Sequence, residues 1–144
     1  MNDGPGDEVH DLQEANERFY RALEALDLAA MERMWLHGPD VRCIHPGSEA
    51  LVGWDSVRAA WEQIFANTRW MRVTPTDVRL QVIGEVGLVA CAENITATLD
   101  EDVGVAVAQA TNVFRKTPQG WRMILHHASP APVTVTQPFS GTVQ

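Results

Sequence analysis

The sequence predicts an α+β domain in which helices come first and an antiparallel sheet comes last. Apolar residues recur at three- and four-residue intervals in the first half of the chain, and the spacing changes to two after residue 71. Turn residues separate the alternating stretches, as in a strand meander. The 144 residues show no internal repeat and fit one domain. We expect a flexible leader at 1–7, the domain at 8–130 and a tail at 131–144.

Three helices are expected. Residues 8–26 carry one apolar stripe: Leu12, Ala15, Phe19, Ala22, Leu23 and Leu26. Asp27 can cap a second helix over 28–35, because its carboxylate can accept from the free N–H groups of the first turn. A third helix opens at Gly53 and runs to about residue 68, with a dense apolar face: Val57, Ala60, Trp61, Ile64 and Phe65.

The strands are expected around and after the third helix. A β-prone segment at 41–45 ends at Pro46 and Gly47. An alternating stretch reaches residue 83, and a second strand at 86–99 returns along it. A third strand at 105–116 and a fourth at 121–129 flank a turn at 117–120. A strand-like piece at 133–136 could extend a sheet edge or dock loosely as a tail.

Charge and composition exclude several classes of function. The formal net charge is −8 without a local Lys/Arg cluster, which disfavours nucleic acid and anionic membranes as partners. No apolar run approaches the roughly 18 residues of a membrane span, and the N-terminus lacks signal-peptide features, so we expect a cytoplasmic protein. Cys43 and Cys91 are expected to be small buried hydrophobes rather than a disulfide. We expect neither a metal site nor a cofactor, since no zinc-ligand spacing occurs.

The order of elements and several local strings together resemble the nuclear transport factor 2-like superfamily, in its SnoaL-like branch. The strings are FYRALEALDL at 19–28, DVRCIHP at 40–46, ATNVFR at 110–115 and GWRMILHHAS at 120–129. The superfamily includes ketosteroid isomerases and scytalone dehydratase, and the last string is also similar to the calcium/calmodulin-dependent kinase association domain. The resemblance covers roughly residues 10–130. It implies a cystatin-like cone, with three helices packed on a curved, mainly antiparallel sheet around a pocket.

The resemblance assigns chemistry to His45 and Asn112. Strand alternation places Val41, Cys43 and His45 on one face, and the residue matching His45 in the isomerases is the general-base Asp. An imidazole can move a proton near neutral pH, although His45 could instead bond the neighbouring loop. Asn112 matches the protonated Asp that donates to a developing enolate oxygen. Alternatively, Asn112 is a buried amide that forms hydrogen bonds with neighbouring protein groups and offers none to a ligand.

Four aromatic side chains are candidates for the pocket wall. Phe19 matches the isomerases' oxyanion Tyr but has no donor, which counts against ketosteroid isomerase activity. Tyr20 lies about 100° further round the helix and either reaches the pocket mouth or packs half-buried. Trp61 and Phe65 are expected in the core or the pocket wall.

Glu93 shares a strand face with Cys91 and Ile95. Burial in that apolar setting would raise its pKa. The alternative is an ion pair with Arg79 or another cross-strand arginine.

His126 and His127 point to opposite faces of the last strand, so one of them enters the pocket. If Lys116 pairs with Trp121, His127 shares the face of Asn112, and we expect His127 inside. A one-residue slip would select His126 instead.

Two functions are compatible with these observations. The first is a cofactor-free isomerase, cyclase or dehydratase acting on a small hydrophobic molecule, in which His45 moves a proton. The alternative is a non-catalytic ligand-binding or dimerisation module. In either case we expect a homodimer through the outer sheet face, which carries Val103, Val105, Val107 and Val113.

Overall fold

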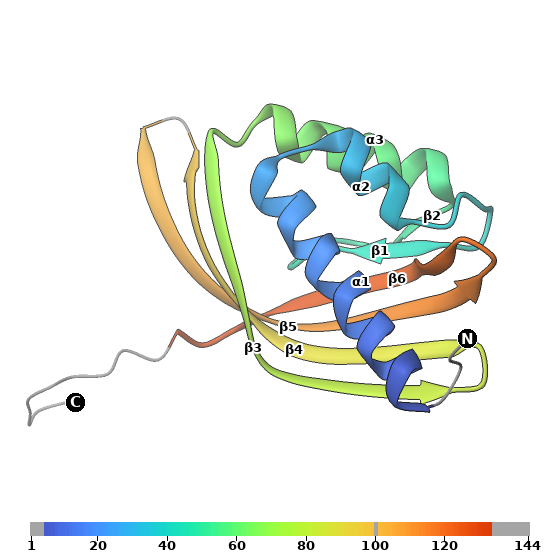
Figure 1. Ribbon diagram of the computed structural model, residues 1–144. Helices are drawn as coiled ribbons and strands as arrows, with labels where there is room; N and C mark the ends of the chain where they lie inside the picture. Colours follow the sequence, from blue (N-terminus) through green and yellow to red (C-terminus); the bar gives the residue numbers. More distant parts are fainter. Residues whose placement is uncertain (1–4, 100, 134–144) are drawn as a thin grey trace, which may run out of the picture.

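The computed structural model describes residues 5–99 and 101–133, and it confirms the predicted α+β class. The helices are α1 (Pro5–Ala25), α2 (Leu28–Met34) and α3 (Trp54–Ala66). The strands are β1 (Arg42–Ile44), β2 (Leu51–Val52), β3 (Trp70–Ile83), β4 (Val86–Leu99), β5 (Asp102–Thr117) and β6 (Gly120–Ala131). All six form one sheet in the order β2-β1-β6-β5-β4-β3. Among the strand pairs of the described residues, β1 and β6 alone run parallel. The sheet curves around the helices, with α1 across its concave face (Figure 1).

The helix boundaries follow the predicted signals with small shifts. Helix α1 begins at Pro5, within the expected leader, because the fixed φ and missing N–H of proline suit a first helical position. The rest of that leader, residues 1–4, lies outside the described residues. Asp27 caps α2 as predicted, since its Oδ1 accepts from the Ala30 N–H at 3.1 Å. Among the described helices, none is long and apolar enough to cross a bilayer.

The strands differ from their predicted ranges by a few residues at most: β4 matches 86–99, β5 and β6 are longer than predicted, and β1 is shorter. Strand β3 already begins at Trp70, and its pairing with β4 shifts between Thr76 and Arg79. Asp77 has a φ of 51° within this irregularity, which interrupts the alternation there. Strand β2 was not predicted, because two residues show no periodicity. Of the expected tail, residues 131–133 are described, so most of the strand-like piece at 133–136 lies outside the described residues.

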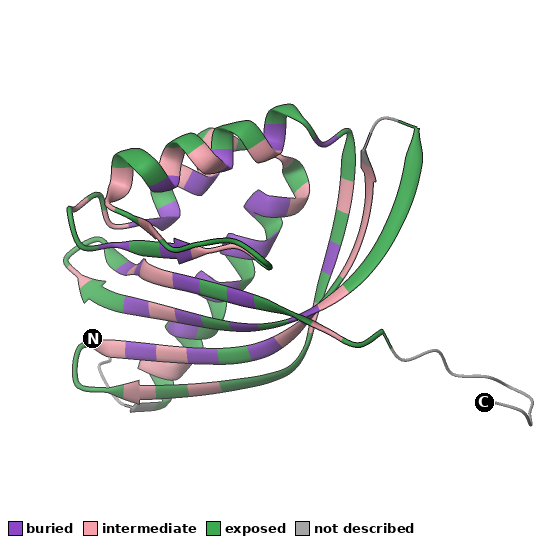
Figure 2. Cartoon of the chain, turned by 180° about the vertical axis from the view of Figure 1, so that it is seen from behind, coloured by how far each residue is buried: buried purple, intermediate pink, exposed green. Residues whose placement is uncertain are grey.

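The core lies between α1 and the concave face of the sheet, where every second residue from Gly87 to Glu93 in β4 and from Ala108 to Phe114 in β5 is buried (Figure 2). Helix α1 and the sheet approach closely at Gly87. A Cβ at this position would lie 2.6 Å from the Cδ1 atom of Leu12, which is itself fully buried. Gly87 therefore lets α1 rest directly on the backbone of β4. The same concave face also buries two polar residues, Glu93 and Asn112.

The β5–β6 register decides which terminal histidine enters the interior. Lys116 pairs with Trp121, as predicted, but the register shifts between Val113 and Phe114. Val113 then pairs with Leu125 while Phe114 pairs with Met123, so β6 carries one extra residue. As a result Asn112 pairs with His126, which is buried, and His127 is exposed. The expectation that His127 points inward is therefore wrong, because a β-bulge supplies the one-residue slip.

Candidate functional site

A cluster of buried polar side chains occupies the interior of the cone. Its members come from α1, β4, β5 and β6, and none is more than 3% exposed: Asn16, Tyr20, Glu93, Asn112 and His126. Buried polar groups are stable only when they are hydrogen-bonded. The bonds within the cluster therefore determine the chemical state of each member.

Asn112 is the centre of this network. Its Nδ2 donates to Asn16 Oδ1 at 2.9 Å and to the Tyr20 hydroxyl at 3.0 Å. Its Oδ1 lies 2.6 Å from His126 Nδ1. Since the amide oxygen can only accept, His126 Nδ1 carries a proton and the lone pair of the neutral ring is on Nε2. Both amide hydrogens of Asn112 are engaged, so it holds its neighbours in place rather than offering the predicted donor to a ligand.

Tyr20 and Glu93 form the second part of the network. The Tyr20 hydroxyl donates to Glu93 Oε2 at 2.6 Å and lies 3.3 Å from Cys91 Sγ. Burial raises the pKa of Glu93, and the bond from Tyr20 offsets part of this rise. Burial, followed by the nearby Glu93, also raises the pKa of Tyr20, which keeps its proton. Tyr20 is thus a fully buried donor rather than a half-buried packing residue.

Glu93 and His126 approach each other in a setting that disfavours the charged form of both. Their Oε2 and Nε2 atoms are 4.0 Å apart, beyond the length of a strong hydrogen bond. Burial, with contributions from His45 and His127, lowers the pKa of His126 to about 3. Because burial also raises the pKa of Glu93, the neutral acid and the neutral imidazole are favoured over an ion pair. The alternative ion pair is not formed: among the described residues no arginine pairs with Glu93, and Arg79 contacts Asp77 at 3.2 Å instead.

His45 follows the end of β1 and turns toward this cluster. Its ring meets the edge of Trp61 at 4.8 Å and lies 6.3 Å from the ring of His126, both between centroids. Its Nε2 lies 3.4 Å from Cys43 Sγ. Burial lowers the pKa of His45, which favours a neutral ring at pH 7. His45 is half-buried beside the exposed segment 46–50, so it lies between the cluster and solvent.

Aromatic rings surround the polar cluster. Phe19, Trp61 and Phe65 are all buried, and Phe19 lies 5.0 Å from the ring of His126 and 5.9 Å from that of Trp61. The indole Nε1 of Trp61 is buried without a hydrogen-bond partner. An unpaired buried N–H is a donor that the oxygen of a ligand can use.

Sequence reasoning missed Asn16, whose spacing of four residues from Tyr20 places both on one face of α1. Four hollows of the described residues lie elsewhere, and none of them is lined by Tyr20, Glu93, Asn112 or His126. Within the described part of the chain, no three His, Cys, Asp or Glu side chains are grouped as metal ligands.

Comparisons with known proteins show the family and the fold of the chain. The sequence model of the SnoaL-like domain matches residues 12–134. A proposed dehydratase of the NTF2-like family from Streptomyces avermitilis is 35% identical, with a TM-score of 0.86 over 90% of this chain and 100% of that one. A proposed calcium/calmodulin-dependent protein kinase type II association domain from Thiobacillus denitrificans is 33% identical, with a TM-score of 0.70 over 83% and 94% of the two chains. The F-box protein SKIP8 of Arabidopsis thaliana is 29% identical over 79% of this chain, which spans about half (47%) of that protein.

Proposed function

The chain belongs to the SnoaL-like domain family, and on that basis we propose that it binds a small hydrophobic carbonyl compound inside the cone and moves a proton on it without a cofactor. One observation carries this proposal: a carboxyl group, a phenol and two imidazoles meet among buried aromatic rings, and burial disfavours the charged form of each. Such groups can give and take protons without first burying a charge. The similarity to the proposed Streptomyces dehydratase supports dehydration as the first reaction to test.

In this reaction His45 is the base. Its neutral ring removes the proton on the carbon next to the carbonyl group of a β-hydroxy ketone, while its partial exposure lets it exchange protons with solvent. Glu93 donates its proton to the departing hydroxyl, so the C–O bond breaks, water leaves and a C=C bond forms. The proton on His45 then returns to the Glu93 carboxylate through solvent. Asn112 acts as a positioning residue, because it orients Tyr20 and His126.

The test follows proton exchange at the reacting carbon. Hydrophobic ketones and β-hydroxy ketones are first screened by thermal shift, since a ligand at 100 times its Kd adds about 2.7 kcal/mol of stability. Binders are then incubated in D2O, and deuterium incorporation and water loss are followed by NMR. His45→Ala should lower the rate by about 10²- to 10⁴-fold while most of the ligand-dependent thermal shift remains.

His127→Gln is the matched control, since it changes the neighbouring histidine on the exposed face. It should retain the wild-type rate. A His45→Ala variant that turns over a confirmed substrate as fast as wild type would refute the role of His45. A wild-type protein that binds compounds without exchange or water loss would assign it to non-catalytic ligand binding.

A second candidate function, assembly, is favoured by the outer face of β5. Val103 and Val105 are 66% and 64% exposed and lie on the face opposite to Asn112. The similar Thiobacillus protein is named as an association domain. A homodimer through this face should appear by sedimentation at micromolar concentration, and Val105→Asp should shift it toward the monomer. A wild-type protein that sediments as a 15.9 kDa monomer would refute this candidate.

A further inference from the structure

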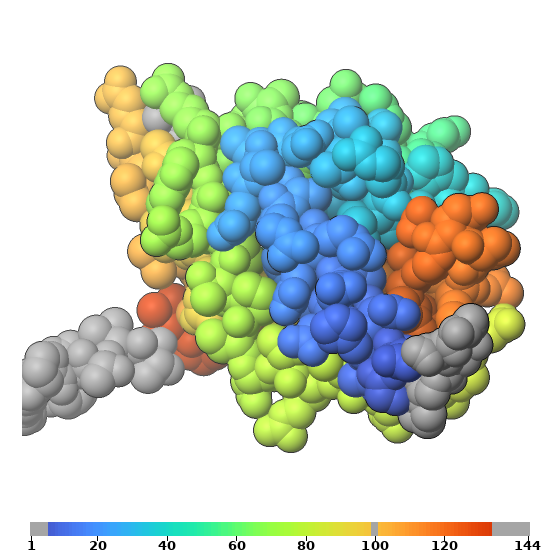
Figure 3. Space-filling model, in the orientation of Figure 1, coloured from blue at the N-terminus to red at the C-terminus, as the bar shows by residue number. Residues whose placement is uncertain are grey.

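We propose that the protein carries a second ligand site, separate from the interior cluster: a groove on the outside of the cone that binds a small organic anion. Helices α1 and α2 and the β5–β6 turn meet on one face of the molecule (Figure 3). Between them lies a cavity of about 510 Å³, which falls within the usual size of small-molecule sites. We call it the arginine groove after its residues Arg18, Arg21, Arg33 and Arg122.

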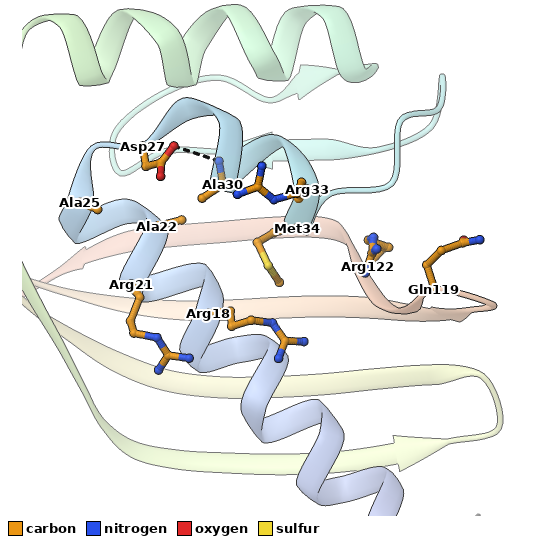
Figure 4. A pocket seen from close by; sticks show the side chains of 10 residues that line it. All are labelled: Arg18, Arg21, Ala22, Ala25, Asp27, Ala30, Arg33, Met34, Gln119 and Arg122. Atoms are coloured by element: carbon orange, nitrogen blue, oxygen red, sulfur yellow. Dashed lines mark hydrogen bonds between the residues drawn. The ribbon is translucent and has the colours of Figure 1, made fainter.

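The groove concentrates positive charge in an acidic protein. The chain has 11 cationic residues and a formal net charge of −8, yet four arginines from three separate elements line this one cavity (Figure 4). The lining contains a single carboxylate, that of Asp27, and its Oδ1 accepts from the Ala30 N–H at 3.1 Å. Charges of one sign brought together in a concave surface raise the local concentration of the opposite ion.

The arginines of the groove are not neutralised by the protein. Across residues 5–99 and 101–133, none of the four takes part in an ion pair. Glu14 and Glu17 precede Arg18 and Arg21 by four residues, a spacing that favours a helical ion pair. Each of these glutamates instead contacts a side chain of the preceding turn. The guanidinium groups of α1 therefore remain available to a ligand.

The lining also indicates what kind of anion fits. A guanidinium group offers paired N–H donors that match the oxygens of a phosphate or a carboxylate. Apolar side chains complete the groove, among them Ala22, Ala30 and Met34. The ligand is thus an anionic group on an apolar body, and the net charge of −8 disfavours a long polyanion such as nucleic acid.

Calorimetric titration of the whole chain with 1-naphthyl phosphate tests this site. The probe should bind more tightly than either inorganic phosphate or 1-naphthol, and raising NaCl from about 20 mM to about 200 mM should weaken it. The double variant Arg18→Gln with Arg33→Gln should lose about tenfold in affinity or more, since each guanidinium bond to an anion is lost. Binding of 1-naphthoate with the same dependence on the arginines would support the proposal and add carboxylates to the ligand class.

The matched control is Arg69→Gln with Arg79→Gln, which removes the same charge from exposed positions outside the groove. It should leave the affinity unchanged. An equal loss in both double variants would overturn the proposal, because net charge alone would then explain binding. Binding of 1-naphthyl phosphate that depends on its phosphate group but survives in the Arg18→Gln, Arg33→Gln variant would overturn the proposal too. The wild-type protein could instead fail to bind the probe and self-associate, with the Arg18→Gln, Arg33→Gln variant remaining unassociated. This result would overturn the proposal and assign the groove to contact with an acidic protein surface.

Discussion

The buried His126 should make the protein lose stability as the pH falls from 7 to 5. Burial lowers the pKa of His126 in the folded protein to about 3 from its ordinary value of 6.5. The unfolded chain therefore binds a proton below pH 6.5 that the folded protein does not, and stability falls as the pH drops from 6.5 toward 3. Since pH 5 lies about 1.5 pH units below the unfolded pKa, the loss by then is about 2 kcal/mol.

Urea unfolding at pH 7, 6 and 5 measures this loss in wild type, His126→Gln and His127→Gln. Glutamine can still donate to Asn112 but does not titrate, so His126→Gln should lose about 2 kcal/mol less than wild type over this range. His45, with its lowered pKa, also makes stability fall as the pH drops, and Glu93, with its raised pKa, makes it rise. Both effects are present in wild type and in the variant, so the difference between the two proteins reports His126. His127→Gln should parallel wild type. Parallel curves for wild type and His126→Gln would refute the reasoning.

Three further substitutions test individual contacts by urea unfolding. Tyr20→Phe removes the hydroxyl that bonds the buried carboxyl and amide, and should cost about 1–3 kcal/mol, with a near-zero change refuting the network. Gly87→Ala should lower the free energy of unfolding by about 1–3 kcal/mol because its Cβ meets Leu12. Combined with Leu12→Ala it should cost less than the sum of the two single losses, and a loss equal to that sum would show that the two side chains do not clash. Asp27→Ala should cost about 1 kcal/mol through loss of the Ala30 cap, and unchanged stability would contradict that cap.

The helices could be predicted from the sequence because each has a local cause. The apolar stripe of α1 and the carboxylate cap of α2 are visible in the order of residues alone. The bulge in β6 has no such signal, since Met123, Ile124 and Leu125 are all apolar and fit either face. The buried positions change phase between Met123 and His126. Packing of this strand against the rest of the core sets that phase, and the sequence does not contain it locally.

The site was predictable to the extent that a strand or helix position implies a direction. Glu93 occupies a strand position whose alternation points inward, and His45 continues the alternation of β1 one residue past its end. The structure places both toward the interior. Partners were not predictable, because the same amide can bond a ligand or a neighbour. Asn112 was expected to have a free donor, but Asn16 and Tyr20 on a distant helix engage both of its hydrogens. Long-range pairings of this kind depend on the tertiary fold.

Asn112 also has a consequence for how the molecule opens. Its amide bonds α1 to the sheet, so lifting this helix away would leave several polar groups unpaired in an apolar interior, at about 1–3 kcal/mol each. The slowest backbone amides of α1 and of the central strands should therefore exchange with solvent deuterium in one cooperative event. Helix α3 faces the same interior through the ring of Trp61, whose N–H makes no hydrogen bond. A compound bound inside the cone, as we propose, would therefore break fewer buried hydrogen bonds by leaving past Trp61 than by displacing α1.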